Sequence, residues 1–157
     1  MLELINVEKN YESPGNEQGV SVLKNITLKV EKGQSLVIAG PSGSGKSTLL
    51  NIIGTLDRPS AGQVLLESID LSRLDDIELS EIRNLQIGFV FQLHHLLPQC
   101  TVLENVIVPT LANKNRPSEK EIQKRATDLL ERVGLKDLLL YRPSELSGGQ
   151  RQRVAVV

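Results

Sequence analysis

The residues best suited to chemistry form one stretch, Gly40–Thr48, which reads GPSGSGKST. They match the pattern G-x-x-x-x-G-K-[ST], with Gly40, Gly45, Lys46 and Ser47 at its fixed positions. Glycines let such a loop curl until successive backbone N–H groups face one anion. The lysine can then reach the outer phosphates of a nucleoside triphosphate, and the hydroxyl after it can ligate Mg²⁺. The pattern therefore predicts a phosphate-binding loop.

The segments beside this loop support the prediction. An apolar run over 35–39 precedes the loop, and an apolar stretch over 49–54 follows it. Strand, loop and helix in this order are the context that the motif requires, and the positive end of the new helix faces the same spot. We therefore prefer this interpretation to a chance match in an ordinary strand-to-helix turn.

Composition narrows the class of protein. The 157 residues are the length of one ordinary domain, and the net charge of −1 gives no electrostatic argument for nucleic acid or an anionic membrane. The single cysteine, Cys100, excludes an internal disulfide, and its simplest role is a small packed side chain. No apolar run approaches the roughly 18 residues of a membrane span, and the first residues are too acidic for a signal peptide. We expect a soluble, cytoplasmic chain.

Hydrophobic periodicity predicts the remaining elements. Period-two or continuous apolar runs indicate strands over 2–7, 22–30, 35–39, 63–67 and 87–91, and turn residues indicate a loop over 13–19 and a tight turn over 31–34. Helical spacing predicts helices over 75–85, 101–111 and 118–133. Thr101 and Ser118 are N-cap candidates because a glutamate follows each of them three residues later.

A second glycine-containing stretch, Leu146–Gln150, reads LSGGQ. Ser147 is an N-cap candidate with Gln150 three residues later. Alone, this stretch fits either an ordinary capped helix start or a helix N-terminus that binds a phosphate.

Together with the phosphate loop, LSGGQ resembles the signature motif of the ATP-binding subunits of ABC transporters. GPSGSGKST looks like the Walker A motif of that family, and Gln92, at the end of FVFQ, looks like its Q-loop glutamine. The resemblance covers essentially the whole chain. The stretches over 91–98, 101–106 and 142–147 are similar to the lipoprotein-releasing (LolD-like), macrolide-export and cell-division branch of the family.

The resemblance implies an α/β fold: a P-loop NTPase core with an antiparallel N-terminal β subdomain and an inserted α-helical subdomain. Residues 1–157 would form a partial ATP-binding domain. In it, 1–92 hold the antiparallel strands and the core, 93–141 the helical subdomain, and 142–157 the signature motif and the start of its helix.

The resemblance also implies roles for single residues. Lys46 and Gln92 would act in catalysis, Ser47 and Gln92 would ligate Mg²⁺, and Tyr11 would stack on adenine, although a half-buried strand-end tyrosine is its alternative. The other predicted nucleotide contacts lie in the loop and in the signature of a facing subunit, at Gly40, Pro41, Ser42, Gly43, Ser44, Gly45, Lys46, Ser47, Thr48, Ser147, Gly148, Gly149 and Gln150.

The implied ligands are ATP and Mg²⁺. The implied partners are a second ATP-binding subunit, head to tail, and an integral membrane permease that would hold the chain on the inner face of the cell membrane. His94 and His95 fit a docking loop better than a metal site, since no further ligand residues accompany them. The alternatives are a non-hydrolysing nucleotide-binding interaction module and an ABC-type ATPase of DNA repair. The second is disfavoured because the sequence has no basic patch, coiled-coil heptads or zinc-ligand cysteines.

The chain departs from the family pattern after the signature motif. The family continues with a strand that ends in Asp-Glu, called Walker B, and later with a switch histidine, and neither follows LSGGQ here. We therefore expect an N-terminal portion of such an ATPase that lacks the C-terminal part of the core sheet. General-base assistance of the kind the missing glutamate supplies is worth roughly 10²- to 10⁴-fold in rate.

The first prediction concerns hydrolysis. We expect the purified 157-residue chain to release phosphate from ATP at a negligible rate, because no carboxylate follows the signature to activate water. Steady phosphate release that Lys46→Ala abolishes would contradict this expectation.

Overall fold

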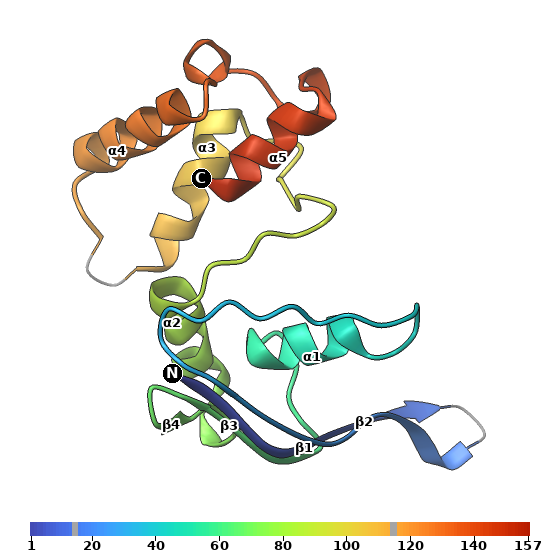
Figure 1. The fold of residues 1–157 in the computed structure, drawn as a ribbon. Coiled ribbons are helices and arrows are strands. Elements are labelled where there is room, and N and C mark those ends of the chain that lie inside the picture. Colours follow the sequence, from blue (N-terminus) through green and yellow to red (C-terminus); the bar gives the residue numbers. More distant parts are fainter. Residues whose placement is uncertain (14–15, 114–115) are drawn as a thin grey trace. The chain divides into compact units, whose positions relative to one another are not determined.

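One antiparallel sheet underlies the N-terminal part of the chain in the computed structural model, which describes residues 1–13, 16–113 and 116–157. Its strands are β1 (Leu2–Ser13), β2 (Asn16–Val30), β3 (Ala61–Leu66) and β4 (Ile69–Asp70), in the order β2-β1-β3-β4. Leu2 pairs with Val30 on one side and with Leu66 on the other. Strand β1 thus lies between β2 and β3 (Figure 1). The antiparallel strands predicted at 2–7, 22–30 and 63–67 are therefore confirmed.

A β-bulge in β1 lets two apolar residues face the core. Leu4 and Val7 are both completely buried, although residues three apart point to opposite faces of a regular strand. Between them β1 has one residue more than β2, and Asn6 has φ +51°. The extra residue reverses the alternation, and asparagine tolerates the left-handed conformation better than most residues.

The prediction of a loop over 13–19 is wrong for the described residues of this range, which lie in strands. β1 continues to Ser13 and β2 begins at Asn16, so most of this polar stretch belongs to a long hairpin. Pro14 and Gly15 lie outside the described residues. Turn residues there suggested a break, but pairing of the backbones overrides the weak strand propensity of such sequences.

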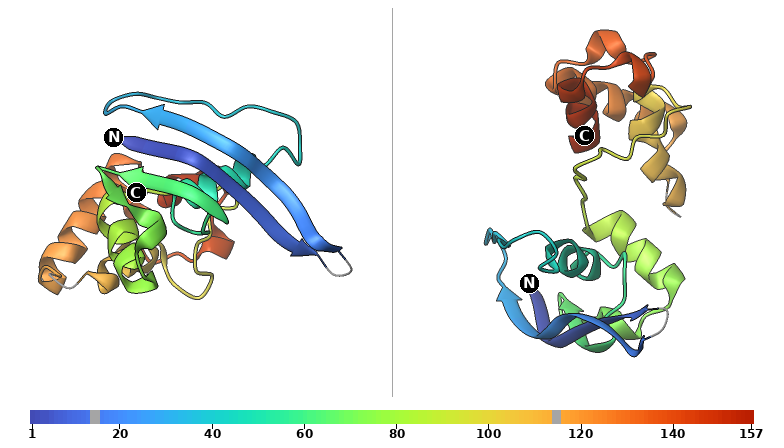
Figure 2. Two further views of the ribbon diagram at one scale, coloured as in Figure 1. Left: turned by 90° about the horizontal axis from the view of Figure 1, so that it is seen from below. Right: turned by 90° about the vertical axis from the view of Figure 1, so that its right-hand side faces the viewer.

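Two helices cover the sheet in the N-terminal unit. Helix α1 (Lys46–Ile53) packs on β2 and buries Leu49 and Ile52 (Figure 1 and Figure 2). After the short 3₁₀ helix η1 (Leu71–Arg73), helix α2 (Asp76–Gln86) buries Leu79 and Ile82. The helix expected at 75–85 is thus present, within one residue at each end.

The strands expected at 35–39 and 87–91 do not form. Both segments lack regular secondary structure and pair with no strand in the described part of the chain. Val37 is 86% exposed and Val90 is 58% exposed, against the expected burial. An apolar run becomes a strand only when a neighbour accepts its backbone hydrogen bonds, and this sheet supplies none to either segment.

The chain divides into two compact units, Met1–Arg83 and Asn84–Val157. The second unit is helical, with α3 (Val102–Ile107), η2 (Val108–Ala112), α4 (Glu119–Arg132), η3 (Lys136–Leu138), η4 (Pro143–Glu145) and α5 (Gly148–Val156). In the described ranges, no helix combines the length and the apolar character that crossing a membrane requires.

Capping boxes set the start of the main helices in this unit. The side chains of Thr101 and Ser118 accept from the backbone N–H three residues later, and the glutamates there accept in return. Both predicted N-caps are confirmed. The helix predicted over 101–111 changes to 3₁₀ geometry at Val108, because Pro109 has no N–H to donate to the preceding turn.

The core of the C-terminal unit gives a stability prediction. Leu130 is completely buried in a cluster with Val102, Leu135, Leu146 and Val154. We expect Leu130→Ala to lower the free energy of unfolding by about 2–5 kcal/mol, because it removes packed atoms and leaves a cavity. Urea denaturation followed by circular dichroism measures this loss. Leu140→Ala is the matched control, since Leu140 is 81% exposed and should change stability by less than about 0.5 kcal/mol.

Candidate phosphate-binding site

The predicted phosphate loop leads directly into helix α1. A turn forms across Pro41–Ser44, with 3.3 Å from the Ser44 nitrogen to the Pro41 oxygen, and Gly43 has φ +79°. Gly45 is the N-cap of α1, with φ +84°, and brings no capping side chain. The first amides of α1 are therefore not capped from within, which leaves them available to an anion.

Lys46 folds back over this loop. Its Nζ donates to the Pro41 carbonyl oxygen at 2.6 Å and approaches the Ser44 hydroxyl at 3.4 Å. The ammonium therefore lies at the loop that the sequence assigned to phosphates. A cation beside uncapped helix amides is an arrangement that favours phosphate oxygens.

A close approach requires the glycine at position 45. A Cβ added there would lie 2.9 Å from Leu23 Cδ2 and 3.2 Å from both Val22 Cγ1 and the Val22 oxygen. Both Val22 and Leu23 belong to β2. A side chain at residue 45 would therefore press against β2, and the positive φ disfavours one as well.

Tyr11 lies beside the same helix. Its hydroxyl donates to Asp57 Oδ2 at 2.7 Å, and Lys9 Nζ lies 4.7 Å from the centre of its ring. The hydrogen bond to Asp57 and partial burial raise the pKa of Tyr11, while a hydrogen bond with Thr48 lowers it. The structure thus ties the predicted adenine-stacking residue to Asp57, which follows the helix that begins at the predicted loop.

Sequence reasoning missed Lys9 and Asp57. Lys9 Nζ lies 2.6 Å from Asp57 Oδ1, and only 12% of the Lys9 side chain is exposed. Burial raises the pKa of the Asp57 carboxyl, but hydrogen bonds from Lys9, Tyr11 and the Arg58 backbone outweigh it and hold that pKa below its usual value. Neither residue belongs to a motif, so no sequence signal separates them from ordinary surface charges.

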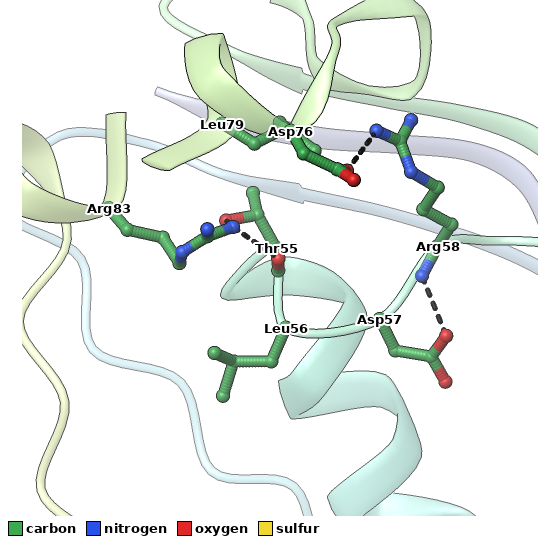
Figure 3. A pocket seen from close by; sticks show the side chains of 7 residues that line it. All are labelled: Thr55, Leu56, Asp57, Arg58, Asp76, Leu79 and Arg83. Carbon is green, nitrogen blue, oxygen red and sulfur yellow. Dashed lines mark hydrogen bonds and ion pairs between the residues drawn. The ribbon is translucent and has the colours of Figure 1, made fainter. Parts of the chain in front are cut away.

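A pocket of about 430 Å³ lies beyond the end of α1 (Figure 3). Arg83 Nη1 donates to the Thr55 oxygen at 2.9 Å, and Arg58 Nη2 donates to Asp76 Oδ1 at 2.8 Å. Both arginine side chains therefore already donate hydrogen bonds to residues of the same unit. The remaining lining residues are Leu56, Asp57 and Leu79, and none of the residues that line this pocket belongs to the predicted site.

Gln92 lies in the C-terminal unit, exposed in a turn. The turn continues through His94 and His95, which both have positive φ, +63° and +51°. The His95 ring packs edge-on against Phe91 at 4.6 Å. The contact of Gln92 with Mg²⁺ stays a prediction.

The signature segment starts helix α5 as expected. Ser147 is its N-cap and forms a capping box with Gln150, which confirms the cap predicted from the sequence. Gly148 and Gly149 are exposed, and a Cβ at either position would meet no atom within 4 Å. Leu146, just before the cap, is buried in the core of its unit. The first two residues of α5 are therefore exposed, while the residue before its cap is anchored in the core of the unit.

The two units divide the predicted site residues between them. Tyr11 and the whole of 40–48 belong to the N-terminal unit, and Gln92 and 147–150 belong to the C-terminal unit. The ligand roles assigned to all of these residues stay predictions.

Two glycines of the loop give a matched test. Gly43→Ala should lower the free energy of unfolding by about 1–2 kcal/mol, because the only penalty is the left-handed conformation of the alanine. Gly45→Ala should lower it by the same amount and by roughly 1–3 kcal/mol more, because its Cβ also meets Val22 and Leu23. Urea denaturation of both variants measures the difference. Equal losses would show that the contact with β2 contributes nothing.

Known proteins resemble this chain over nearly its whole length. The ABC transporter ATP-binding protein YvrO of Bacillus subtilis, itself uncharacterised, is 54% identical over 99% of the chain and 66% of its own length. The lipoprotein-releasing system ATP-binding protein LolD 1 of Rhodopirellula baltica is 47% identical over 99% of the chain and 66% of its own length. The chain thus spans about two thirds of the length of these relatives.

A solved structure agrees with these relatives. The ATP-binding cassette MJ0796, in a dimeric post-hydrolysis state bound to ADP and Pi, is 45% identical and superimposes with a TM-score of 0.89 over 99% of this chain and 67% of its own. This match confirms the predicted α/β cassette fold. The family model described as "ABC transporter" matches residues 23–157, and the chain belongs to this family.

Proposed function

We propose that this chain supplies the ATP-binding loop and the signature motif of an ABC transporter subunit, in which ATP binding and hydrolysis drive export or lipoprotein release through a membrane permease. The observation that carries the proposal is the loop before α1, where Lys46 and the uncapped helix amides meet. The relatives, which include an ATP-binding protein of a lipoprotein-releasing system, support it.

The loop and its surroundings would divide the work of binding ATP. Residues 40–48 would hold the phosphates, with Lys46 on the outer ones, and Tyr11 would stack on the base. The exposed Ser47 hydroxyl in the first turn of α1 and the Gln92 amide oxygen fit Mg²⁺, which prefers oxygen ligands. The metal would neutralise phosphate charge there.

A second subunit would complete the site. The MJ0796 cassette is a dimer with ADP and Pi, which supports a head-to-tail pair in this family. The start of α5, which is exposed at Ser147, Gly148 and Gly149 and half-buried at Gln150, would then face the γ-phosphate held by the partner. We further propose that residues 1–92 form the nucleotide-binding part, 93–141 the helical subdomain that contacts the permease, and 142–157 the signature.

Calorimetry with Mg-ATP tests the proposal. We expect the chain to bind, and Lys46→Ala to weaken binding by about 10- to 100-fold, because a hydrogen bond to a charged group is worth roughly 1.5–3 kcal/mol. Lys32→Ala is the control, since it removes the same charge from an exposed turn of the same unit and should bind normally. No binding by the unmodified chain, or equal effects of the two substitutions, would contradict the assignment.

A further inference from the structure

The Asp57 carboxylate holds three groups around the tyrosine that is predicted to stack on adenine. Oδ2 accepts from the Tyr11 hydroxyl at 2.7 Å. Oδ1 accepts from Lys9 Nζ at 2.6 Å and from the Arg58 backbone nitrogen at 2.7 Å, and the last of these bonds is drawn in Figure 3. Two oxygens thus take three donors, so the carboxylate has little freedom to turn.

Lys9 restrains the same ring from a second direction. Its ammonium lies 4.7 Å from the Tyr11 ring centre and also donates to the Arg58 carbonyl oxygen at 2.8 Å. Lys9 and Tyr11 are two apart on β1 and share one face of the strand. Tyr11 nevertheless remains 39% exposed, so part of it is free for a ligand.

A backbone hydrogen bond to helix α1 helps to fix the position of Asp57. Beyond the end of α1, the Asp57 nitrogen donates to the Asn51 oxygen at 3.2 Å, which ties the turn to the helix. The same helix begins at the predicted phosphate loop. One rigid element therefore connects the loop with the support of the tyrosine.

We propose that Asp57, together with Lys9, is a positioning residue that holds the Tyr11 ring in the orientation needed to stack on the base of a bound adenine nucleotide. This inference rests on the proposed function. Asp57 acts only through Tyr11, so it contributes to affinity for the base and contributes nothing to affinity for the phosphates. Base–aromatic stacking changes affinity by roughly 5- to 150-fold, which sets the scale of the effect.

Comparing ATP with inorganic tripolyphosphate separates the two contributions. By calorimetry we expect Asp57→Asn to weaken ATP binding about tenfold, within the range for lost stacking, and to leave tripolyphosphate binding unchanged. Asp76→Asn is the matched control, because the Asp76 carboxylate interacts with the side chains of Arg58 and Arg83 instead of Tyr11 and Lys9, and it should change neither affinity. Equal ATP affinity in Asp57→Asn and the unmodified chain would overturn the proposal, as would equal losses for the two ligands.

A second variant keeps the test decisive if Asp57→Asn does not fold. Tyr11→Phe keeps the stacking ring and removes only the hydroxyl that Asp57 holds. We expect a selective loss of ATP affinity of about three- to tenfold, part of the full stacking contribution, because the ring remains but loses the hydrogen bond to the charged carboxylate that orients it. Unchanged ATP binding by Tyr11→Phe would show that the ring needs no positioning.

A spectroscopic measurement reports on the contact itself. The chain has two tyrosines and no tryptophan, so in a Tyr141→Phe background Tyr11 is the only such chromophore. Because Asp57 raises the pKa of Tyr11, Asp57→Asn should lower that pKa in an ultraviolet titration. No change would contradict the contact.

If the unmodified chain binds neither ATP nor tripolyphosphate, the proposed function fails as well, whereas binding tripolyphosphate as tightly as ATP overturns only the role of Asp57.

Discussion

The approach of Gly45 to strand β2 is the contact on which the candidate site depends. The chain turns into α1 at φ +84°, and a Cβ there would lie within 3.2 Å of Val22 and Leu23. The glycine lets the start of α1 pack closely on β2, and the predicted phosphate loop leads into α1 at the same point. The turn after its end brings Asp57 to Tyr11. One close backbone contact therefore relates the predicted phosphate site to the predicted base site.

The C-terminal unit presents its signature in a different way. There the exposed part has no close neighbours, and its position comes from the buried residue before it. Leu146 is packed with Val102 and Leu130, while Ser147 closes the first turn of α5 with Gln150. An apolar anchor and a capping box together hold an open helix start, which is the geometry that an approaching anion needs.

The two missing strands show how burial depends on partners. The runs over 35–39 and 87–91 are apolar enough for a buried strand, yet Val37 and Val90 are exposed. Neither run finds a strand to pair with in the described residues. Conversely, the polar stretch that begins at Asn16 joins strand β2 because β1 lies alongside it. In both cases pairing decides the structure and the composition of the segment does not.

The sequence by itself determined the features that short-range rules specify. These are the predicted phosphate loop with its helix and the caps at Thr101, Ser118 and Ser147, which need only residues a few positions apart. The strands were predicted from their alternation, but only the tertiary structure paired Leu2 with Leu66. Only the tertiary structure decided that Asp57 supports Tyr11, because these residues are 46 positions apart and no sequence motif links them. Contacts between distant segments follow from how helix and sheet pack, and local sequence carries no record of that packing.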